Sequence, residues 1–212
     1  MYIPSHFEER RAEVLHRLVA EHSFGTLVTL GSGGLGANHL PFELDPGAGP
    51  LGTLRAHVAR ANPVWRDCAG EVEALAIFQG PGAYVSPSWY PAKQEHGKVV
   101  PTYNYIVVHA HGPIRVIDDP VWLKALIERL TDTHEAGRPV PWKVADAPAD
   151  YIEKMLGAIV GIEIPISRLQ GKWKASQNRG AADRRGVAQG LLAAGGEQAA
   201  AMAAAVMAMP DG

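Results

Sequence analysis

The chain has 212 residues, 47% of them hydrophobic, so it can bury a substantial core, and its length allows one large domain or one domain with an appendage. A formal net charge of −2 provides no global attraction to nucleic acid, so any DNA-binding surface must concentrate its positive charge locally. No run approaches the roughly 20 apolar residues of a membrane-spanning helix, and residues 1–4 lack signal-peptide features, which favours a cytoplasmic protein without a membrane partner. The single cysteine, Cys68, has no partner for an intramolecular disulfide and is expected to be a small core residue.

The N-terminal segment carries a helix start signal. Ser5 and Glu8 have the spacing of a capping box, in which the serine caps the helix and the glutamate returns to the serine amide. Apolar residues then recur close to helical spacing, which predicts one buried stripe. Its members are Phe7, Val14, Leu15, Leu18 and Val19.

From Phe24 the pattern changes to short β-prone runs. Turns rich in glycine or bearing proline separate the first three, which predicts an antiparallel meander in which sequence neighbours pair. Six such runs favour a small barrel, and with flanking helices the fold class is mainly β, α+β. The predicted strands are residues 24–30, 37–44, 52–60, 72–78, 105–117 and 159–169.

Helices are predicted in the second half of the chain. Asp119 followed by Pro120 is a helix start, an N-cap acid with proline at the first helical position. Residues 148–156 read as a second helix. In the alanine-rich end, residues 181–192 are predicted to be helical and to break at Gly195-Gly196, followed by a frayed or partner-packed helix or by disorder. We therefore expect a main domain over residues 1–178 and a helical extension over 179–212.

Three segments combine aromatic, amide and charged residues in ways that no strand or helix requires. Residues 80–90 form an aromatic loop that suits a planar ligand, a subunit interface or a well-packed barrel corner. Residues 100–105 and 172–178 offer hydroxyls, amides and two lysines, the donors that a phosphate or a flavin ring needs, although a solvated turn has the same composition. A fourth segment, residues 53–63, puts Arg55 and His57 on one strand face, where both can donate to phosphate oxygens.

Taken together, these motifs resemble the PaiB family. The resemblance spans the chain up to about Asn178, and only Tyr103 departs, where the family usually has tryptophan. It rests on residues 1–4 with His6-Phe7, 57–63 (HVARANP), 83–90 (AYVSPSWY), 101–105 (PTYNY) and 174–178 (KASQN).

The resemblance implies an FMN-binding split β-barrel, antiparallel and similar to pyridoxine phosphate oxidases, in which a homodimer holds two flavins at its interface. It also implies a negative transcriptional regulator, and thus DNA as a further partner. The residues carried over as FMN contacts are His39, Arg55, His57, Arg60 and Asn62 toward the phosphate, Thr102 and Asn104 toward the ring or ribityl chain, and Lys174, Ser176 and Gln177 late in the chain.

Other chemistry has weaker support in the sequence. His109 and His111 alternate on a strand, but no further ligand at metal spacing accompanies them, so no metal is expected. No catalytic residue is assigned. The most basic predicted helix, residues 179–185, carries little clustered positive charge for binding DNA. Besides the regulator, two hypotheses stay open: a flavin-dependent oxidoreductase acting on a small molecule or a nicotinamide cofactor, and an interaction module that has lost its cofactor.

Overall fold

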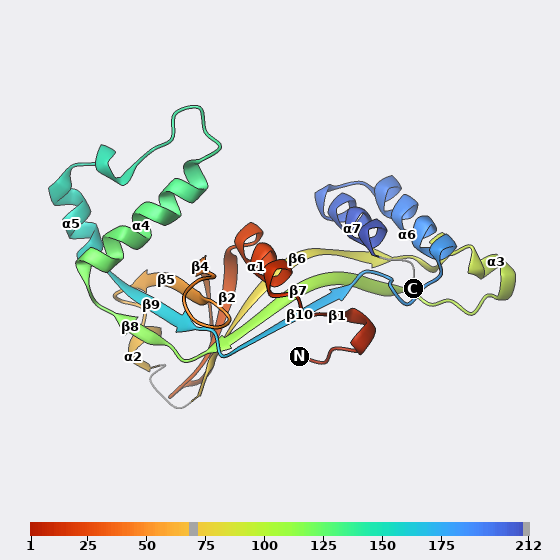
Figure 1. The fold of residues 1–212 in the computed structure, drawn as a ribbon, viewed down its shortest axis with the longest axis horizontal. Coiled ribbons are helices and arrows are strands. Elements are labelled where there is room, and N and C mark those ends of the chain that lie inside the picture. The colour runs from red at the N-terminus through yellow and green to blue at the C-terminus, as the bar shows by residue number, and fades with distance from the viewer. Residues whose placement is uncertain (68–71, 210–212) are drawn as a thin grey trace. The chain divides into compact units, whose positions relative to one another are not determined.

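The computed structural model describes residues 1–67 and 72–209 (Figure 1). Cys68, which the sequence predicts to be a core residue, lies outside them. Internal contacts divide the chain into two compact units. Unit 1 consists of residues 1–15, 79–108 and 170–212, and unit 2 of residues 16–78 and 109–169. Three strands have residues in both: β6 (Ala74–Val85), β7 (Thr102–Gly112) and β10 (Arg168–Lys174).

Unit 2 is built on antiparallel strand pairs. β2 (Phe24–Gly31) pairs with β3 (Gly34–Pro41) along its whole length and with the first part of β6. A four-stranded sheet has the order β4-β5-β9-β8, formed by β4 (Glu43–Asp45), β5 (Thr53–Ala59), β9 (Ile159–Pro165) and β8 (Arg115–Ile117). Alternate residues of β2 and β5 are buried, because successive side chains of a strand point to opposite faces. The core contains Leu27, Phe42, Leu54, Ala56, Val58 and Phe78.

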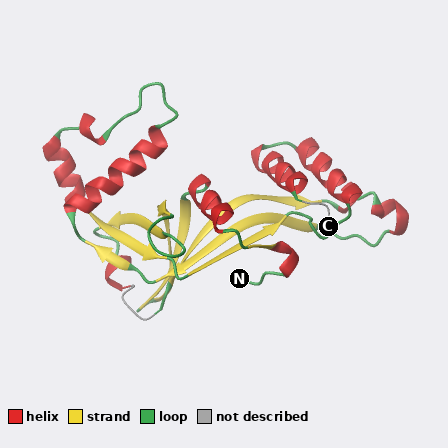
Figure 2. Cartoon of the chain, in the orientation of Figure 1, coloured by secondary structure: helices red, strands yellow, loops and turns green. Residues whose placement is uncertain are grey.

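Helices cover part of this unit. α1 (Ala12–Glu21) begins at the end of unit 1, α2 (Val64–Asp67) follows β5, and α4 (Pro120–Glu135) and α5 (Ala149–Gly157) lie side by side in Figure 1. The Asp119 side chain accepts a hydrogen bond from the Val121 amide at 2.8 Å, which confirms the predicted N-cap of α4. Between α4 and α5 the chain is loop except for the short η3 (Val144–Asp146) (Figure 2).

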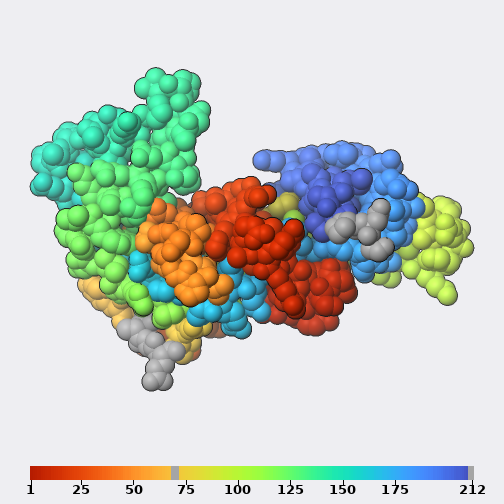
Figure 3. All heavy atoms as spheres, in the orientation of Figure 1, coloured from red at the N-terminus to blue at the C-terminus, as the bar shows by residue number. Residues whose placement is uncertain are grey.

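Unit 1 holds both chain ends. η1 (Ser5–Phe7) leads into β1 (Glu8–Glu9), which pairs with β10, and α3 (Ala92–His96) follows the aromatic loop with its short η2 (Pro87–Trp89). α6 (Ala181–Ala194) and α7 (Glu197–Ala208) form one closely packed layer, drawn in blue in Figure 3. Helix α6 ends at Gly195, whose φ is positive, so the predicted break at this glycine pair is confirmed.

The predicted capping box at Ser5 is wrong. Ser5 begins only the short η1, and Glu8 belongs to β1, where it lies opposite Lys172. The helix starts instead at Ala12, and the Glu9 carboxylate provides the local cap by accepting the Arg11 amide at 2.9 Å. Pairing with β10 therefore prevails over a local sequence signal, as tertiary context often does.

Several predicted strands have different bounds. The expected strand over 37–44 is two strands, β3 and β4, and the one over 105–117 is divided into β7 and β8. β6 continues past Phe78 through the Gly80–Gly82 segment to Val85, and β10 extends to Lys174. Antiparallel sheets with flanking helices confirm the predicted α+β class, and no helix among the described residues is long and apolar enough to cross a membrane.

Candidate functional site

The ten predicted flavin contacts fall into two groups. Unit 2 contains His39, Arg55, His57, Arg60 and Asn62, and unit 1 contains Thr102, Asn104, Lys174, Ser176 and Gln177. The structure brings several members of the second group into direct contact, whereas those of the first group face different surroundings.

Both arginines of unit 2 already have acidic partners. Arg55 forms ion pairs with Asp45 at 3.0 Å and with Glu163 at 3.3 Å. Arg60 donates to both carboxylate oxygens of Asp118, at 2.8 and 2.6 Å, and this pairing raises the pKa of the guanidinium. A phosphate would have to compete with these carboxylates for either arginine.

Asn62 and His39 lie on different faces of the β2–β3 hairpin. Asn62 donates to the Asn38 side chain at 2.7 Å and accepts from the Val64 amide at 3.0 Å, beside a hollow of about 330 Å³. His39 follows Asn38 on β3 and so points to the opposite face, where it stacks on Phe24. Asn38, which the sequence analysis missed, is the side-chain partner of Asn62, and no local signal in the sequence joins the two.

His57 lies against the helices of unit 2. Its side chain faces outward from β5 and lines two cavities together with Ile127 and Trp142. Burial lowers the pKa of the imidazole, so the ring is neutral at pH 7. Neither ring nitrogen has a hydrogen-bond partner among the described residues, and Nδ1 is fully buried.

In unit 1, Lys174 is held by neutral oxygens. Its amine donates to the Thr102 hydroxyl and, at 2.6 Å, to the Tyr103 carbonyl. Burial lowers the pKa of this lysine, and the neighbouring Lys172 lowers it further. Two residues predicted separately as flavin contacts, Thr102 and Lys174, are therefore in direct contact.

Lys172 is the other lysine of the 172–178 segment and was not among the ten predicted flavin contacts. It is only 7% exposed, and its amine donates to the Tyr2 carbonyl at 3.1 Å and lies 5.1 Å from the centre of the Tyr105 ring. Because Lys172 and Lys174 alternate on β10, both point to the same face. Neither forms an ion pair with an acidic residue in the described part of the chain.

Asn104 and Ser176 form a buried polar pair in the same unit. The Asn104 amide donates to the Ser176 hydroxyl at 2.9 Å, and the residues are 1% and 3% exposed. Ser176 has a φ of 62°, a left-handed conformation that costs free energy in a residue other than glycine and often occurs at functional sites. The Gln177 side chain secures this turn by accepting from the Ala175 amide at 2.8 Å and donating to the Trp173 carbonyl.

We expect Asn104→Ala to lower the free energy of unfolding by about 1–3 kcal/mol, because it removes the buried hydrogen bond that the Ser176 hydroxyl accepts from the amide. Denaturant unfolding measures the change. The exposed Asn178 is the control, and Asn178→Ala should change stability by no more than about 0.5 kcal/mol. Equal losses in the two variants would contradict a structural role for the pair.

The aromatic loop of residues 80–90 is packed rather than free. A Cβ at Gly186 or Gly190 of α6 would overlap Trp89, so both glycines permit close contact with the loop. Tyr90 is buried beneath the Arg179 guanidinium, 5.0 Å from its ring. This arrangement favours the packed-corner interpretation for Trp89 and Tyr90 over a flavin-stacking one.

His109 and His111 lie close together on β7, with ring centroids 6.4 Å apart. The described residues include no group of three or more side chains suited to hold a metal ion. Burial, with a smaller effect of His111, lowers the pKa of His109 to about 4.

The low pKa of His109 predicts acid sensitivity. Between pH 6.5 and 4 the unfolded chain binds a proton that folded His109 does not, so stability falls as pH falls through this window. We expect His109→Gln to lose less stability than the wild type between pH 6.5 and 4, as measured by denaturant unfolding at each pH. Asn178→Ala, at an exposed position without a titratable group, should retain the wild-type slope, and identical slopes in all three proteins would contradict the assignment.

The chain is similar in sequence to a known protein family and to individual proteins. Residues 1–168 match the family model described as "Putative FMN-binding domain". The chain is 34% identical to "Protease synthase and sporulation protein PAI 2" of Bacillus subtilis, over 90% of this chain and 89% of that protein. An uncharacterized protein of Emericella nidulans is also 34% identical, over 90% of each chain.

Solved structures share the fold at low identity. The FAD and heme binding protein of Mycobacterium smegmatis has a TM-score of 0.59 and 19% identity, over 90% of this chain and 80% of that one. The flavocytochrome Anf3 of Azotobacter vinelandii has a TM-score of 0.57 and 13% identity, over 79% and 69%. The antiparallel α+β fold and the matched family model together define a flavin-binding protein of the split-barrel class, as the sequence predicts. Within this class, the chain belongs to the PaiB family of FMN-binding proteins.

Proposed function

We propose that the chain binds FMN as its cofactor and that Lys172 and Lys174 hold the phosphate. The observation that carries the proposal is the pair of lysines on one face of β10, both partly or fully buried and without acidic partners among the described residues. A cation removed from water without a counterion is unfavourable, and a phosphate dianion would offset that cost through charge-assisted hydrogen bonds. The FMN description of the matched family model supports this choice of flavin.

The remaining polar groups complete the proposed flavin contacts. Thr102 contacts Lys174 directly, and Asn104, Ser176 and Gln177 of the same unit carry hydroxyl and amide groups that suit the ribityl chain or the ring edge. For His39 and Asn62, which lie on different faces in unit 2, the family resemblance is the support for a flavin contact. Arg55 and Arg60 would contribute only if FMN displaced their carboxylate partners.

We further propose that the protein is a homodimer that uses the outer face of the β2–β3 hairpin. Phe24 and Leu35 are 69% and 81% exposed, and Leu30, directly opposite Leu35, is also exposed. His39 lies on this same face, so a second chain packed here would approach a proposed flavin contact. Exposed apolar patches of this kind commonly mark subunit interfaces.

The regulatory role is proposed as negative and indirect. The family resemblance supplies the label of transcriptional regulator, but the predicted basic helix is weakened because Arg184 is only 6% exposed and donates to the Met209 carbonyl. We therefore expect no sequence-specific DNA binding by the chain alone. Tight, sequence-selective binding of genomic fragments in a mobility-shift assay would contradict indirect action.

A flavin-dependent oxidoreductase is the second candidate function. It is favoured by the exposed rings of Tyr84 on β6 and Tyr103 on β7, which offer flat surfaces for a second planar molecule such as a nicotinamide. Oxidation of NADH or NADPH by the flavin-loaded protein would support this function. A flavin that stays oxidised with both would count against it.

FMN and riboflavin together test the proposed cofactor site, because the two differ only by the phosphate. We expect the flavin-free protein to bind FMN about 10-fold or more tightly than riboflavin, since a charge-assisted contact contributes about 1.5–3 kcal/mol. Flavin fluorescence quenching gives both affinities. Equal affinities would refute phosphate recognition while leaving ring binding intact.

A further inference from the structure

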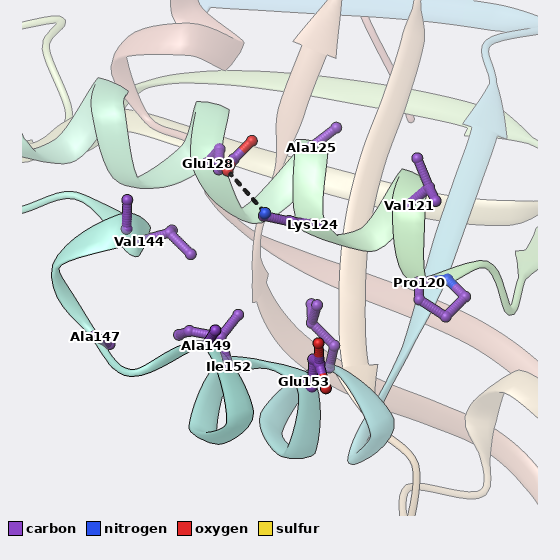
Figure 4. A pocket seen from close by; sticks show the side chains of 12 residues that line it. Pro120, Val121, Lys124, Ala125, Glu128, Val144, Ala147, Ala149, Ile152 and Glu153 are labelled. Carbon is purple, nitrogen blue, oxygen red and sulfur yellow. Dashed lines mark ion pairs between the residues drawn. The ribbon is translucent and has the colours of Figure 1, made fainter.

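Three adjoining cavities lie within unit 2. Two lie between β5 and the helical segment that follows β8, and the third lies between α4, η3 and α5. Their volumes are about 360, 400 and 710 Å³. The first two share His57, Ile127 and Trp142, and the last two share Lys124, Val144, Ile152 and Leu156. Figure 4 shows the largest, with Lys124 and Glu128 on α4 facing Ile152 and Glu153 on α5. Volumes of this size accommodate small molecules.

The walls are mostly apolar, and one aromatic residue is held at the point where two cavities meet. The Trp142 amide donates to the Glu135 carboxylate at 3.1 Å, and Arg138 pairs with the same carboxylate at 2.8 Å. These contacts fix the loop after α4 and hold the half-exposed Trp142 at the cavities. Ile127 and Trp142 thus provide a surface for a flat ring.

His57 supplies a polar group to two of these mostly apolar cavities, one of which Thr131 and His134 also line. His57 lines both cavities that Trp142 lines, and its Nε2 is accessible, since only Nδ1 is among the buried atoms without a partner. A neutral imidazole can either donate or accept one hydrogen bond there, according to its tautomer. An unpaired polar side chain at an apolar cavity suggests a ligand that completes the pair.

The charges around the cavities argue against a phosphate. Lys124 pairs with Glu128 at 4.0 Å, and Glu153 and Glu135 add further negative charge to the lining. Arg138, on the loop after α4, is bound by Glu135 at 2.8 Å. A phosphate dianion would be repelled here, whereas a neutral or weakly basic molecule would not.

We propose that these cavities form a binding site for a neutral or weakly basic aromatic molecule that is distinct from the flavin. Its ring packs between Ile127 and Trp142, and one polar group hydrogen-bonds to His57. The site is independent of the proposed flavin contacts of unit 1, so it stands or falls separately from FMN binding. Its ligand is a small-molecule substrate or effector of the flavin-binding protein.

The probe for this site is 2-naphthol, titrated into the full chain while tryptophan fluorescence or heat is followed. We expect saturable binding that Trp142→Ala weakens about 10-fold, because a ring-stacking partner is lost. Val140→Ala is the matched control, since Val140 is exposed on the same loop and does not line the cavities. We expect the wild type to prefer 2-naphthol over naphthalene about fivefold. His57→Phe should remove most of this preference, because an aromatic ring remains but the hydrogen bond to the hydroxyl is lost.

Two further measurements test whether 2-naphthol binds in these cavities. Ala59→Phe fills the middle cavity from an exposed position on β5 and should abolish 2-naphthol binding even if Trp142→Ala perturbs the loop. Binding should be weaker for 2-naphthyl phosphate than for 2-naphthol and should be unchanged by saturating FMN. Absence of saturable binding, equal losses in Val140→Ala and Trp142→Ala, or stoichiometric displacement of 2-naphthol by FMN would each overturn a separate aromatic site.

Discussion

Lys174→Ala is expected to weaken FMN binding about 10- to 100-fold, because loss of a charge-assisted phosphate contact costs about 1.5–3 kcal/mol. Among the described residues this amine donates to the Thr102 hydroxyl and the Tyr103 carbonyl and to no carboxylate, so no acidic partner there has to be displaced before it meets a phosphate. Removing it also relieves the cost of keeping a cation partly buried, so the folded chain should not lose stability through this charge. Flavin fluorescence titration measures the change in affinity.

Riboflavin and a surface lysine provide the controls for this variant. Lys174→Ala should bind riboflavin about as well as the wild type does, because riboflavin has no phosphate. Lys98→Ala, at an exposed position of the same unit, should leave both affinities unchanged. If Lys174→Ala weakened riboflavin and FMN equally, the residue would act on the ring or the fold and not on the phosphate. Unchanged FMN affinity would remove Lys174 from the site.

Leu35→Glu is expected to convert the proposed dimer to monomers. Leu35 is 81% exposed and lies opposite Leu30 on the outer face of the β2–β3 hairpin. A dimer related by two-fold symmetry would carry the change twice, so the lost apolar burial amounts to about 3 kcal/mol or more. Light scattering coupled to size exclusion should show the molar mass falling by half, and FMN affinity should fall with it if the partner chain completes the flavin site.

Val140→Glu is the control for Leu35→Glu, because Val140 is 86% exposed on a loop of the same unit. It should leave the molar mass unchanged. A wild-type protein that is monomeric at micromolar concentration would refute the homodimer directly. A dimer that survives Leu35→Glu would place the interface on another surface.

The sequence predicted most strands and helices and the antiparallel pairing of the first three runs better than it predicted pairing between distant segments. The alternation of apolar residues in β2 and β5 and the Asp119-Pro120 start of α4 are local signals, and the structure contains all three elements. The prediction of an N-terminal capping box was wrong because Glu8 lies opposite Lys172 in the β1–β10 strand pair. A pairing between residues so far apart in the chain has no local sequence signal. The extension of β6 through Gly80 and Pro81 was missed because these residues usually mark turns.

The candidate site was predictable where the family resemblance and strand alternation agree. The resemblance singled out Thr102, Asn104, Lys174 and Ser176, and the structure joins them in two direct contacts. It did not reveal that the arginines of unit 2 are engaged by acids, because ion pairs such as Arg60 with Asp118 depend on residues far apart in sequence. Lys172 could have been found, since it alternates with Lys174. Trp142 could not, because a loop residue has no period that places it at a cavity.

FMN titration of flavin-free protein, followed by visible absorption, tests the central claim most directly. If the chain binds FMN through the groups described, the flavin bands should shift and sharpen, saturate near one flavin per chain, and persist after removal of excess ligand. A spectrum that stays that of free FMN at every protein concentration would contradict flavin binding by this chain and leave the split barrel as a statement about its fold alone.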